Sequence, residues 1–401
     1  MDYPLAHSAA LAPPPEWEIL RERCPVAPVR LPGGDEALLV TRYEDVRQVL
    51  SDPRFGRQPD APEPARSPDT EPEGLFKDEW SAVLPQSGPG HQQWRRLLGR
   101  WFTARRMTEL RPEIEAMAHR LVDDMIRSGK PADLKSALAY PLPVRVICAM
   151  LGVPAADRDK FARWSETMLS LTRYTQAERA ASQIEFAGYM ARHIEARSEE
   201  PAGDLISELA TARDARGRTL SPALLVATSQ ALLIAGHETT TNTIGTMVAM
   251  LLADRGRWER LLEDRSLVRT GVEEALRFDA DLGFGTVRYI DTSIEVSGTH
   301  VLGGTTVICD MAAANRDETA FEAAGEMDLG RSPNAHLSFG TGPHSCLGQS
   351  LARTELQAVL EILLARLPSL ELAVPAAELR RVEGLAVTGL REVPVTWHEN
   401  E

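Results

Sequence analysis

Residues 224–253, LLVATSQALLIAGHETTTNTIGTMVAMLLA, form the sequence feature that most constrains the fold of this chain. Apolar residues lie around nearly the whole circumference of a helix drawn through this segment, which is typical of a helix in a protein interior. Ser221 and Pro222 come just before it and are typical of an N-cap and a first helical turn. His237 and Glu238 lie in its middle and argue against a transmembrane span. The segment therefore predicts one long buried helix.

Most of the remaining segments show helical periodicity, and the sequence contains no internal repeat. Residues 37–40 predict a strand that leads into a helix at 43–50. Residues 293–298 and 300–308 alternate apolar with polar side chains around glycines, which predicts a small hairpin sheet. Residues 53–90 are rich in proline and acidic residues and predict a long loop, either functional or simply solvated. We expect one large, mainly α-helical body with a small β region.

Charge and cysteine usage exclude several classes of protein. The chain has 44 basic and 58 acidic residues, a formal net charge of -14, which argues against a nucleic-acid partner. Its four cysteines are far apart and form no CxxC pair, which argues against a disulfide framework or a structural zinc site and favours a reducing cytoplasm. The N-terminal stretch has no basic patch followed by an apolar run, so we expect no signal peptide or membrane anchor. These observations predict a soluble cytoplasmic protein.

The stretch HLSFGTGPHSCLG, residues 336–348, places Cys346 in a glycine-rich turn directly before a helical pattern. A thiolate acts as a ligand or nucleophile when its pKa is lowered, and the amino end of a following helix supplies both a dipole and free N–H groups. Gly340, Gly342 and Gly348 allow the backbone to turn tightly around the sulfur. For an arbitrary cysteine, a small buried hydrophobe would be the better interpretation, but these surroundings favour a functional thiolate.

This stretch resembles the signature FxxGxxxCxG of the cytochrome P450 family at Phe339, Gly342, Cys346 and Gly348. His344 and the pair Ala352-Arg353 fit the bacterial form of the signature. The resemblance extends over nearly the whole chain, from residues 38–55 through 102–107 and 312–317 to the cysteine turn. It implies one cytochrome P450 domain over residues 1–401, mainly α, with a long central helix over a buried haem. The small β subdomain would combine N-terminal strands with about residues 283–310.

The family also suggests which residues contact the cofactor, haem b (iron protoporphyrin IX). Cys346 would be the axial thiolate ligand of the iron, an arrangement that favours O–O cleavage. The two haem propionates need basic partners when they are buried, and His91, Arg95, Arg288 and His336 match the family's propionate contacts. Each of these alone is better explained as a solvated or capping residue, but together, in the family's order, they favour the functional interpretation. The full set expected at the cofactor is His91, Arg95, Ala235, Arg288, His336, Phe339, Gly340, His344, Cys346 and Gly348.

The middle of the long helix resembles the family's oxygen-binding segment. Gly236 permits a close approach to the backbone, and the Thr239 hydroxyl can compete for a carbonyl one turn back, which would open the helix locally. By resemblance, Glu238 would feed protons and Thr239 would hold the oxygen species during protonation of dioxygen. The alternative is a buried helix whose polar residues bond one another.

Glu274 and Arg277 supply the Glu-x-x-Arg pattern of the family at helical i, i+3 spacing. The pattern is weak alone, because it also occurs at Glu18/Arg21, Glu44/Arg47, Glu63/Arg66 and Glu378/Arg381. Only Glu274 and Arg277 lie between the long helix and the cysteine turn. By resemblance this pair locks the scaffold near the haem and does no chemistry.

The family's pocket regions correspond here to 53–90, 166–200, 282–284 and 386–387, and their mostly small and aliphatic residues name no ligand. The segment around Phe284 is richer in glycine than the family pattern, so the shape of that strand stays open. The residues expected to line the pocket are Val83, Leu84, Leu232, Ala235, Gly236, Leu282, Phe284 and Val387.

The acid and threonine at 238 and 239 suggest an oxygen-activating enzyme that hydroxylates or epoxidises a hydrophobic small molecule, commonly in natural-product biosynthesis. Electrons would come from NAD(P)H through a separate reductase and ferredoxin, because no flavin or iron-sulfur segment is appended. The basic residues expected to dock the ferredoxin are Arg95, Arg96, Arg100, Arg105 and Arg106. Oxidative coupling of two centres by radical chemistry, without oxygen insertion, is the alternative. A haem protein that binds gases without catalysis is a more distant one.

Overall fold

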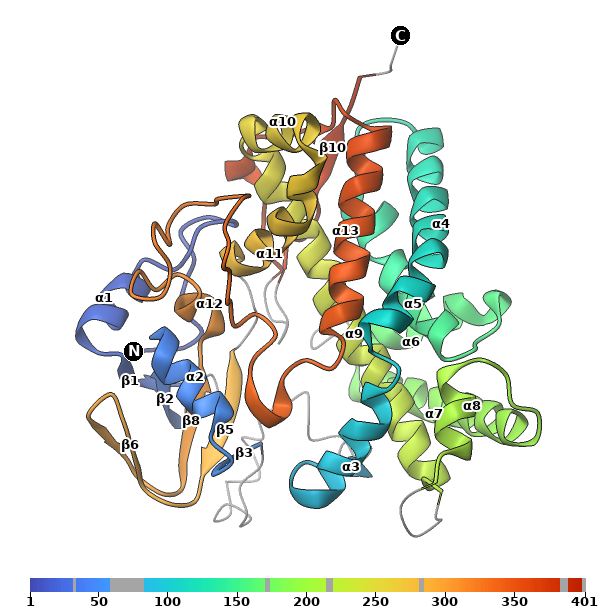
Figure 1. Cartoon of the computed structure of the whole chain (residues 1–401), viewed down its shortest axis with the longest axis horizontal. Coiled ribbons are helices and arrows are strands. Elements are labelled where there is room, and N and C mark those ends of the chain that lie inside the picture. Colours follow the sequence, from blue (N-terminus) through green and yellow to red (C-terminus); the bar gives the residue numbers. More distant parts are fainter. Residues whose placement is uncertain are drawn as a thin grey trace.

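The computed structural model describes residues 1–31, 34–57, 83–169, 174–213, 219–280, 285–382 and 389–398. Figure 1 shows a helical body on one side and the β region, with α1 and α2, on the other. The expected pocket residues Leu282, Phe284 and Val387 lie outside the described residues, as does most of the 53–90 loop. The prediction of a mainly α fold with a small β region is confirmed.

Helices make up most of the body. The α-helices are α1 (Glu16–Arg23), α2 (Tyr43–Ser51), α3 (Gly88–Gly99), α4 (Ala104–Ser128), α5 (Pro141–Met150), α6 (Arg158–Leu169), α7 (Gln176–Glu199), α8 (Leu205–Thr211), α9 (Pro222–Leu252), α10 (Arg255–Glu263), α11 (Val268–Phe278), α12 (Met311–Ala314) and α13 (Gln349–Arg366). Shorter 3-10 turns span Ala155–Asp157, Arg265–Leu267, Gly342–His344 and Ala376–Glu378, and a π-helical turn spans Lys135–Ala139.

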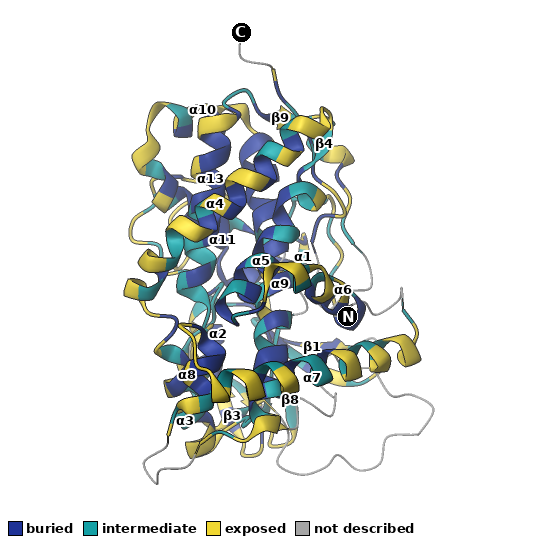
Figure 2. Cartoon of the chain, turned by 90° about the vertical axis from the view of Figure 1, so that its right-hand side faces the viewer, coloured by how far each residue is buried: buried dark blue, intermediate teal, exposed yellow. Residues whose placement is uncertain are grey.

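The long buried helix predicted from the sequence is α9, which runs for 31 residues through the centre of the body. Ser221 is its N-cap, because the Ser221 Oγ accepts a hydrogen bond of 3.2 Å from the Leu224 N–H, and Pro222 follows in the first turn. Helices α5, α6, α7, α10, α11 and α13 pack around it. Figure 2 shows the resulting dark, buried centre. Among the described residues, no helix combines the length and apolarity that a bilayer crossing requires.

The main sheet has five strands in the order β1-β2-β8-β5-β3. Their bounds are β1 (Val26–Arg30), β2 (Glu36–Val40), β3 (Phe55–Gly56), β5 (Thr286–Ile290) and β8 (Thr305–Cys309). β2 and β8 are parallel, with Leu39 opposite Ile308, and the other pairs are antiparallel. Strands from the N-terminal region and from the 285–309 region therefore form one sheet, and β2 leads into α2 as the sequence predicts.

The hairpin predicted over 293–308 is only half as long as expected. β6 (Ile294–Val296) pairs with β7 (Thr299–Val301), but the chain then turns at Gly303 and Gly304, and β8 joins the main sheet. A Cβ at Gly303 would lie 2.5 Å from the Asp291 carbonyl oxygen, and Gly304 has a φ of +85°. Gly303 and Gly304, which the sequence pattern places inside one strand, thus form a turn between two sheets. A third sheet joins β4 (Ala132–Asp133), β10 (Pro394–Thr396) and β9 (Glu371–Leu372).

Candidate active site

The segment that holds Cys346 is a tight turn closed by its own backbone. The Cys346 N–H donates to the Phe339 carbonyl at 2.7 Å, and the Gly340 N–H donates to the Leu337 carbonyl at 2.7 Å. Gly342 has a φ of +73°, and a Cβ there would lie 2.5 Å from the Leu50 carbonyl oxygen at the end of α2. Glycine is required at this position because the turn packs directly on that backbone.

Cys346 lies two residues before Gly348, the N-cap of α13. Although part of its surface is accessible, protein atoms surround the thiol, and this desolvation raises the pKa of Cys346. The Gly348 N–H, which donates toward the sulfur, and the nearby Arg95 and Arg353 act in the opposite direction without outweighing burial. The sequence predicted a lowered pKa for this thiol, and the net direction is the reverse. The helix amino end and the cations favour the thiolate, but the protein alone does not ionise it.

The other three cysteines have different surroundings. Cys148 and Cys309 are fully buried, and burial raises the pKa of each thiol to about 12. Cys24 is exposed near the end of α1, and its Sγ lies 3.6 Å from the Val26 carbonyl oxygen. Cys346 is thus the cysteine that combines an exposed residue surface, a helix amino end and nearby guanidinium groups.

Five basic side chains gather beside the cysteine turn, and we refer to them as the basic group: Arg57, His91, Arg95, Arg288 and His344. They come from the end of β3, from α3, from β5 and from the cysteine turn itself. The ring centroids of His91 and His344 are 4.5 Å apart, and an Arg95 Nη donates to the Ser345 carbonyl at 2.5 Å. Sequence analysis predicts four of the five as cofactor contacts and misses Arg57.

The members of the basic group repel one another. Burial, followed by the charges of Arg288, His91, Arg57 and Arg95, lowers the pKa of His344 to about 3. Burial also lowers the pKa of Arg288 to about 10, and the pKa values of His91 and Arg95 are lowered mainly by burial. Among the described residues, no carboxylate raises the pKa of any of these four groups. This arrangement fits a ligand that brings its own anionic groups, as the two propionates of haem would.

His336 is the expected propionate contact that the structure does not bring into the basic group. Its Nε2 lies 3.1 Å from a carboxylate oxygen of Glu273 on α11, and its Nδ1 accepts from the Ser338 N–H at 3.3 Å. Arg353 on α13 binds the same carboxylate, with its Nε 2.7 Å from Glu273, and stacks over the Phe339 ring at 4.4 Å. Burial alone would raise the pKa of Glu273, but hydrogen bonds from His336 and Arg353 outweigh it and hold that pKa at about 2. Both ring nitrogens of His336 are engaged in bracing the cysteine turn.

The oxygen-binding segment predicted on α9 keeps its helical backbone. The Thr239 hydroxyl donates to the Ala235 carbonyl at 2.6 Å, as expected, yet α9 is continuous from Pro222 to Leu252, so the expected local opening is absent. Ala235 and Thr239 are exposed in the middle of this mostly buried helix. A Cβ at Gly236 would lie 2.8 Å from the Ile147 Cδ1, so the close approach at Gly236 is made by α5. Gly236 therefore has a packing role against Ile147, and its place in the substrate pocket stays a prediction.

The remaining expected pocket residues that the structure describes differ in burial. Leu232 is partly buried against the main core, Val83 is 44% exposed and Leu84 is half-buried. Ala235 and Thr239 are thus the members of the predicted set whose exposed side chains share one face of α9.

Two ionisable residues beside Thr239 have different surroundings. His237 is fully buried: its Nδ1 lies 2.6 Å from the Ser165 hydroxyl of α6 and its Nε2 lies 3.2 Å from the Tyr140 carbonyl. Burial lowers the pKa of His237 to about 4, so the ring is neutral and donates from Nε2 to the carbonyl. Burial raises the pKa of the half-buried Glu238, against the opposing effects of Lys135 and Asn242. Sequence analysis missed the His237 bridge, although a histidine inside an apolar helix requires buried partners.

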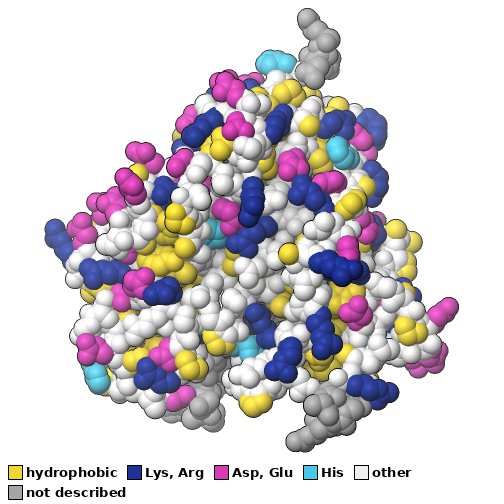
Figure 3. Space-filling view, viewed as in Figure 1, with side chains coloured by type: hydrophobic (Ala, Val, Ile, Leu, Met, Phe, Trp, Pro, Cys, Tyr) yellow, Lys and Arg dark blue, Asp and Glu magenta, His cyan; other side chains and the backbone are white. Residues whose placement is uncertain are grey.

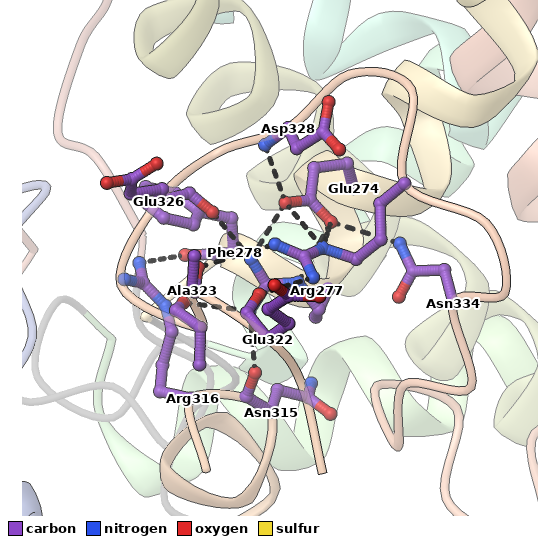
Figure 4. Close-up of polar contacts among 12 residues, drawn as sticks. Glu274, Arg277, Phe278, Asn315, Arg316, Glu322, Ala323, Glu326, Asp328 and Asn334 are labelled. Atoms are coloured by element: carbon purple, nitrogen blue, oxygen red, sulfur yellow. Dashed lines mark hydrogen bonds and ion pairs between the residues drawn. The ribbon is translucent and has the colours of Figure 1, made fainter. Parts of the chain in front are cut away.

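Glu274 and Arg277 on α11 are both fully buried and form the centre of a hydrogen-bond network (Figure 4). The Arg277 Nε and one Nη donate to the two Glu274 oxygens at 2.8 and 2.7 Å. The remaining Arg277 N–H groups donate to the carbonyls of Asn315, Ala324 and Glu326. Glu274 also accepts from the Asp328 N–H and from the side chains of Arg331 and Asn334. The pair holds the segment before the cysteine turn, as predicted, whereas Glu44 and Arg47 pair at the surface.

Comparison with known proteins identifies this arrangement. A model of the family described as cytochrome P450 matches residues 30–372. The mycinamicin IV hydroxylase/epoxidase of Micromonospora griseorubida is 43% identical over 380 residues, 94% of each chain. The nocardicin C N-oxygenase of Nocardia uniformis subsp. tsuyamanensis is 40% identical over 400 residues, 98% of each chain. The crystal structure of the LnmA cytochrome P450 hydroxylase from the leinamycin pathway of Streptomyces atroolivaceus S-140 superposes with a TM-score of 0.89 at 39% identity, covering 99% of this chain and 100% of that one.

Proposed function

The chain belongs to the cytochrome P450 family, and from that premise we propose that Cys346 holds a haem iron while Glu238 and Thr239 supply protons for oxygen insertion. The protein is a monooxygenase that hydroxylates or epoxidises a hydrophobic small molecule in natural-product biosynthesis. When bound, the haem supplies the activation of dioxygen, so that one oxygen atom enters the substrate and the other leaves as water. The residues of the chain must therefore hold the cofactor, exclude bulk water and deliver protons.

The basic group beside Cys346 is the observation that carries the proposal. Arg95 and Arg288 are desolvated cations, and burial lowers the pKa of each. Their positive charge favours a dianionic ligand, and charge-assisted hydrogen bonds to its carboxylates would replace the repulsion within the group. The same ligand would bring its iron to the Cys346 sulfur, with Phe339, Gly340 and Gly348 shaping the turn around it. The proximal ligand and the propionate contacts thus come from adjoining elements.

Glu238 and Thr239 have the properties that proton delivery requires. Burial raises the pKa of Glu238, so this carboxyl group holds a proton nearer to neutral pH than an exposed glutamate does. Thr239 is exposed, and its Oγ1 donates to the Ala235 carbonyl, which leaves the lone pairs of the hydroxyl oxygen free to accept a proton donor. His237 is neutral down to a pKa of about 4 and serves to fix the helix. Glu238 is therefore the proton source and Thr239 the group that orients the acceptor.

We propose that the electrons come from NAD(P)H through a reductase and an acidic ferredoxin that docks on α3. Arg95 of α3 points to the cysteine turn, whereas Arg96 and Arg100 are exposed. Figure 3 shows Lys and Arg side chains over the lower centre of the molecule, where α3 lies, although the chain as a whole is acidic. A basic patch near the thiolate side favours an acidic partner at that face.

Cys346→Ser tests the haem ligand. The variant should lose the strongly red-shifted Soret band of the reduced carbon monoxide complex, because only a thiolate ligand produces that band. Cys148→Ser, Cys309→Ser and Cys24→Ser are the matched controls and should retain it. If Cys346→Ser keeps the band, the assignment of the ligand is wrong.

Thr239→Ala tests proton delivery. The variant should still bind haem, carbon monoxide and substrate, but the product formed per NAD(P)H should fall roughly tenfold or more as hydrogen peroxide is released. Thr243→Ala is the matched control, since the Thr243 hydroxyl makes the same kind of bond, 2.8 Å to the Thr239 carbonyl, one turn further along α9. Thr239→Ser should restore coupling. If Thr239→Ala lowers the melting temperature but leaves the product formed per NAD(P)H unchanged, the threonine is structural. That result would favour the alternative reaction, in which two centres are joined without oxygen insertion.

A further inference from the structure

The π-helical turn Lys135–Ala139 lies against α9 next to Glu238. The Asp133 carboxylate begins this turn by accepting from the N–H groups of Lys135 and Ser136, at 3.0 and 3.1 Å. The turn ends where the Tyr140 carbonyl meets the His237 Nε2, one residue before Glu238. The Lys135 Nζ donates 2.6 Å to the Leu390 carbonyl oxygen. His237, the residue directly before Glu238, is thus hydrogen-bonded to the end of the turn that carries Lys135.

Glu238 is linked to the same part of the C-terminal segment from the other side. A Glu238 oxygen accepts from the Asn242 Nδ2 at 3.3 Å. Asn242 is buried, and a Cβ added at Gly389 would overlap its side-chain amide. Lys135 contacts Leu390, so Lys135 and the Glu238–Asn242 pair converge on two consecutive residues, Gly389 and Leu390. The Lys135 ammonium and the amide that holds the Glu238 carboxyl group therefore meet at one backbone segment.

The charged and polar groups that act on the pKa of Glu238 come from three elements. Burial raises the pKa of Glu238, Lys135 of the π-helical turn and Asn242 of α9 lower it, and Glu166 of α6 raises it. His237 is neutral and its two ring nitrogens are bonded to Ser165 and Tyr140. Among the groups of the described residues that act on the Glu238 carboxyl group, Lys135 is therefore the cation.

We propose that Lys135 is a positioning residue for proton delivery, which stabilises the carboxylate that Glu238 becomes after it has given up its proton. This inference rests on the proposed function of Glu238. The proton leaves the Glu238 carboxyl for the acceptor oriented by Thr239, the negative charge stays on Glu238 beside the Lys135 ammonium, and a solvent proton later restores the acid. Asn242 holds the same carboxyl through its amide. Neither residue reaches the reacting atoms.

The experiment uses the holoenzyme and separates the charge of Lys135 from its hydrogen bond. Lys135→Gln keeps a donor for the Leu390 carbonyl but removes the charge, and Lys135→Arg keeps both. Lys130→Gln is the matched control, because the Lys130 Nζ makes the equivalent contact, 2.7 Å to the Trp397 carbonyl oxygen. Infrared difference spectra over a pH series give the midpoint of the Glu238 carboxyl band, which is identified by its loss in Glu238→Gln.

The midpoint should rise by about one pH unit, a tenfold change in the proton equilibrium, in Lys135→Gln and stay unchanged in Lys135→Arg and Lys130→Gln. The solvent isotope effect on product formation should increase in Lys135→Gln. In a Glu238→Gln background, Lys135→Gln should cause no further loss of turnover, since the charge that it stabilises is gone.

An unchanged midpoint in a Lys135→Gln protein with a normal haem spectrum would overturn the inference, as would an equal loss of turnover with and without Glu238. If Lys135→Gln does not fold, Lys135→Met takes its place in the same measurements. A separate outcome bears on the proposed function alone: if Glu238→Gln retains full coupled turnover, Glu238 is not the proton source, whatever its midpoint does.

Discussion

Two charged regions of this molecule, one fully buried and one partly exposed, are built on opposite principles. Around Glu274 and Arg277, both fully buried, a carboxylate faces a guanidinium, and all five Arg277 N–H groups have acceptors. Beside Cys346, the basic group places the guanidinium groups of Arg57, Arg95 and Arg288 around two histidines, whose pKa values burial and these charges lower. The first region is complete without any ligand, whereas an anionic ligand would stabilise the second.

The difference shows how charge distinguishes a structural site from a binding site. A buried ion pair whose hydrogen bonds are all satisfied adds rigidity, and removal of one partner leaves an uncompensated charge. A cluster of desolvated cations costs free energy in the isolated protein, and that free energy is recovered when an anion binds. Opposite effects on the stability of the haem-free protein are therefore expected from mutations in the two regions.

The largest effect is expected from Arg277→Leu in the paired region. This substitution takes the donor from three carbonyl oxygens and removes one of the two guanidinium groups that face the buried Glu274 carboxylate, so the free energy of unfolding should fall by about 3 to 5 kcal/mol. Urea unfolding of the haem-free and haem-bound proteins measures it, and both should be destabilised alike. Arg47→Leu is the matched control at the same i, i+3 spacing, because Arg47 and Glu44 are 54% and 68% exposed and such a pair contributes little. An equal loss in the two variants would contradict the comparison.

The next effect tests the basic group through Arg288→Leu. Haem should dissociate roughly ten to a hundred times faster, which corresponds to about 1.5 to 3 kcal/mol for a lost charge-assisted hydrogen bond. The haem-free protein should keep or gain stability, because a desolvated cation has been removed from among like charges. Transfer of haem to an acceptor protein measures the first quantity and thermal unfolding of the haem-free protein the second. Arg265→Leu, which also removes a guanidinium bound to a backbone carbonyl, is the control. Loss of stability without faster haem loss would show that Arg288 is structural.

Glu355 sharpens the comparison, because it is a buried carboxyl group without the partner that Glu274 has. Its Oε2 has no hydrogen-bond partner among the described residues, and burial raises its pKa to about 8. Since the folded pKa lies above that of an exposed glutamate, this group favours the folded state at low pH, and its contribution is lost as the pH rises toward 8. Glu355→Gln should therefore gain stability relative to the parent between pH 5 and 8, by roughly 2 kcal/mol.

The measurement is a series of melting temperatures over that pH range. Glu361→Gln on the same helix is the control, since Glu361 is 46% exposed and pairs with Arg111. It should show no comparable trend. A constant difference between Glu355→Gln and the parent at every pH would mean that Glu355 has a partner in the folded protein.

The sequence was sufficient for features that depend on local pattern. The apolar run of α9, the glycines of the cysteine turn and the spacing of Glu274 and Arg277 each predict the structure that is found. Features that depend on distant partners were not predictable. Glu273 lies 63 residues before His336, and nothing in the local sequence indicates that its carboxylate binds the His336 ring.

The electrostatic balance at two positions was also beyond the sequence. The direction in which the pKa of Cys346 shifts depends on how many atoms surround the thiol. This desolvation outweighs the effect of the helix amino end, which the sequence does indicate. Arg57 joins the basic group because β3 pairs with β5, which carries Arg288. The sequence alone places Arg57 only near the start of a long loop.

The smallest effect is expected on the exposed side of α3, the helix that contributes His91 and Arg95 to the basic group. Arg96→Glu and Arg100→Glu should slow reduction by an acidic ferredoxin roughly three- to tenfold at low ionic strength, because the two proteins then attract one another less. The difference should shrink as salt is added, since exposed charges are screened over about 10 Å at 0.1 M, and reduction by dithionite should not change. Arg127→Glu is the control, because Arg127 is equally accessible, 73% exposed, but at the far end of α4. Stopped-flow reduction over a salt series measures the rates. If Arg96→Glu and Arg127→Glu have the same reduction rates at every salt concentration, the exposed arginines of α3 do not bind the ferredoxin. The ferredoxin then docks elsewhere.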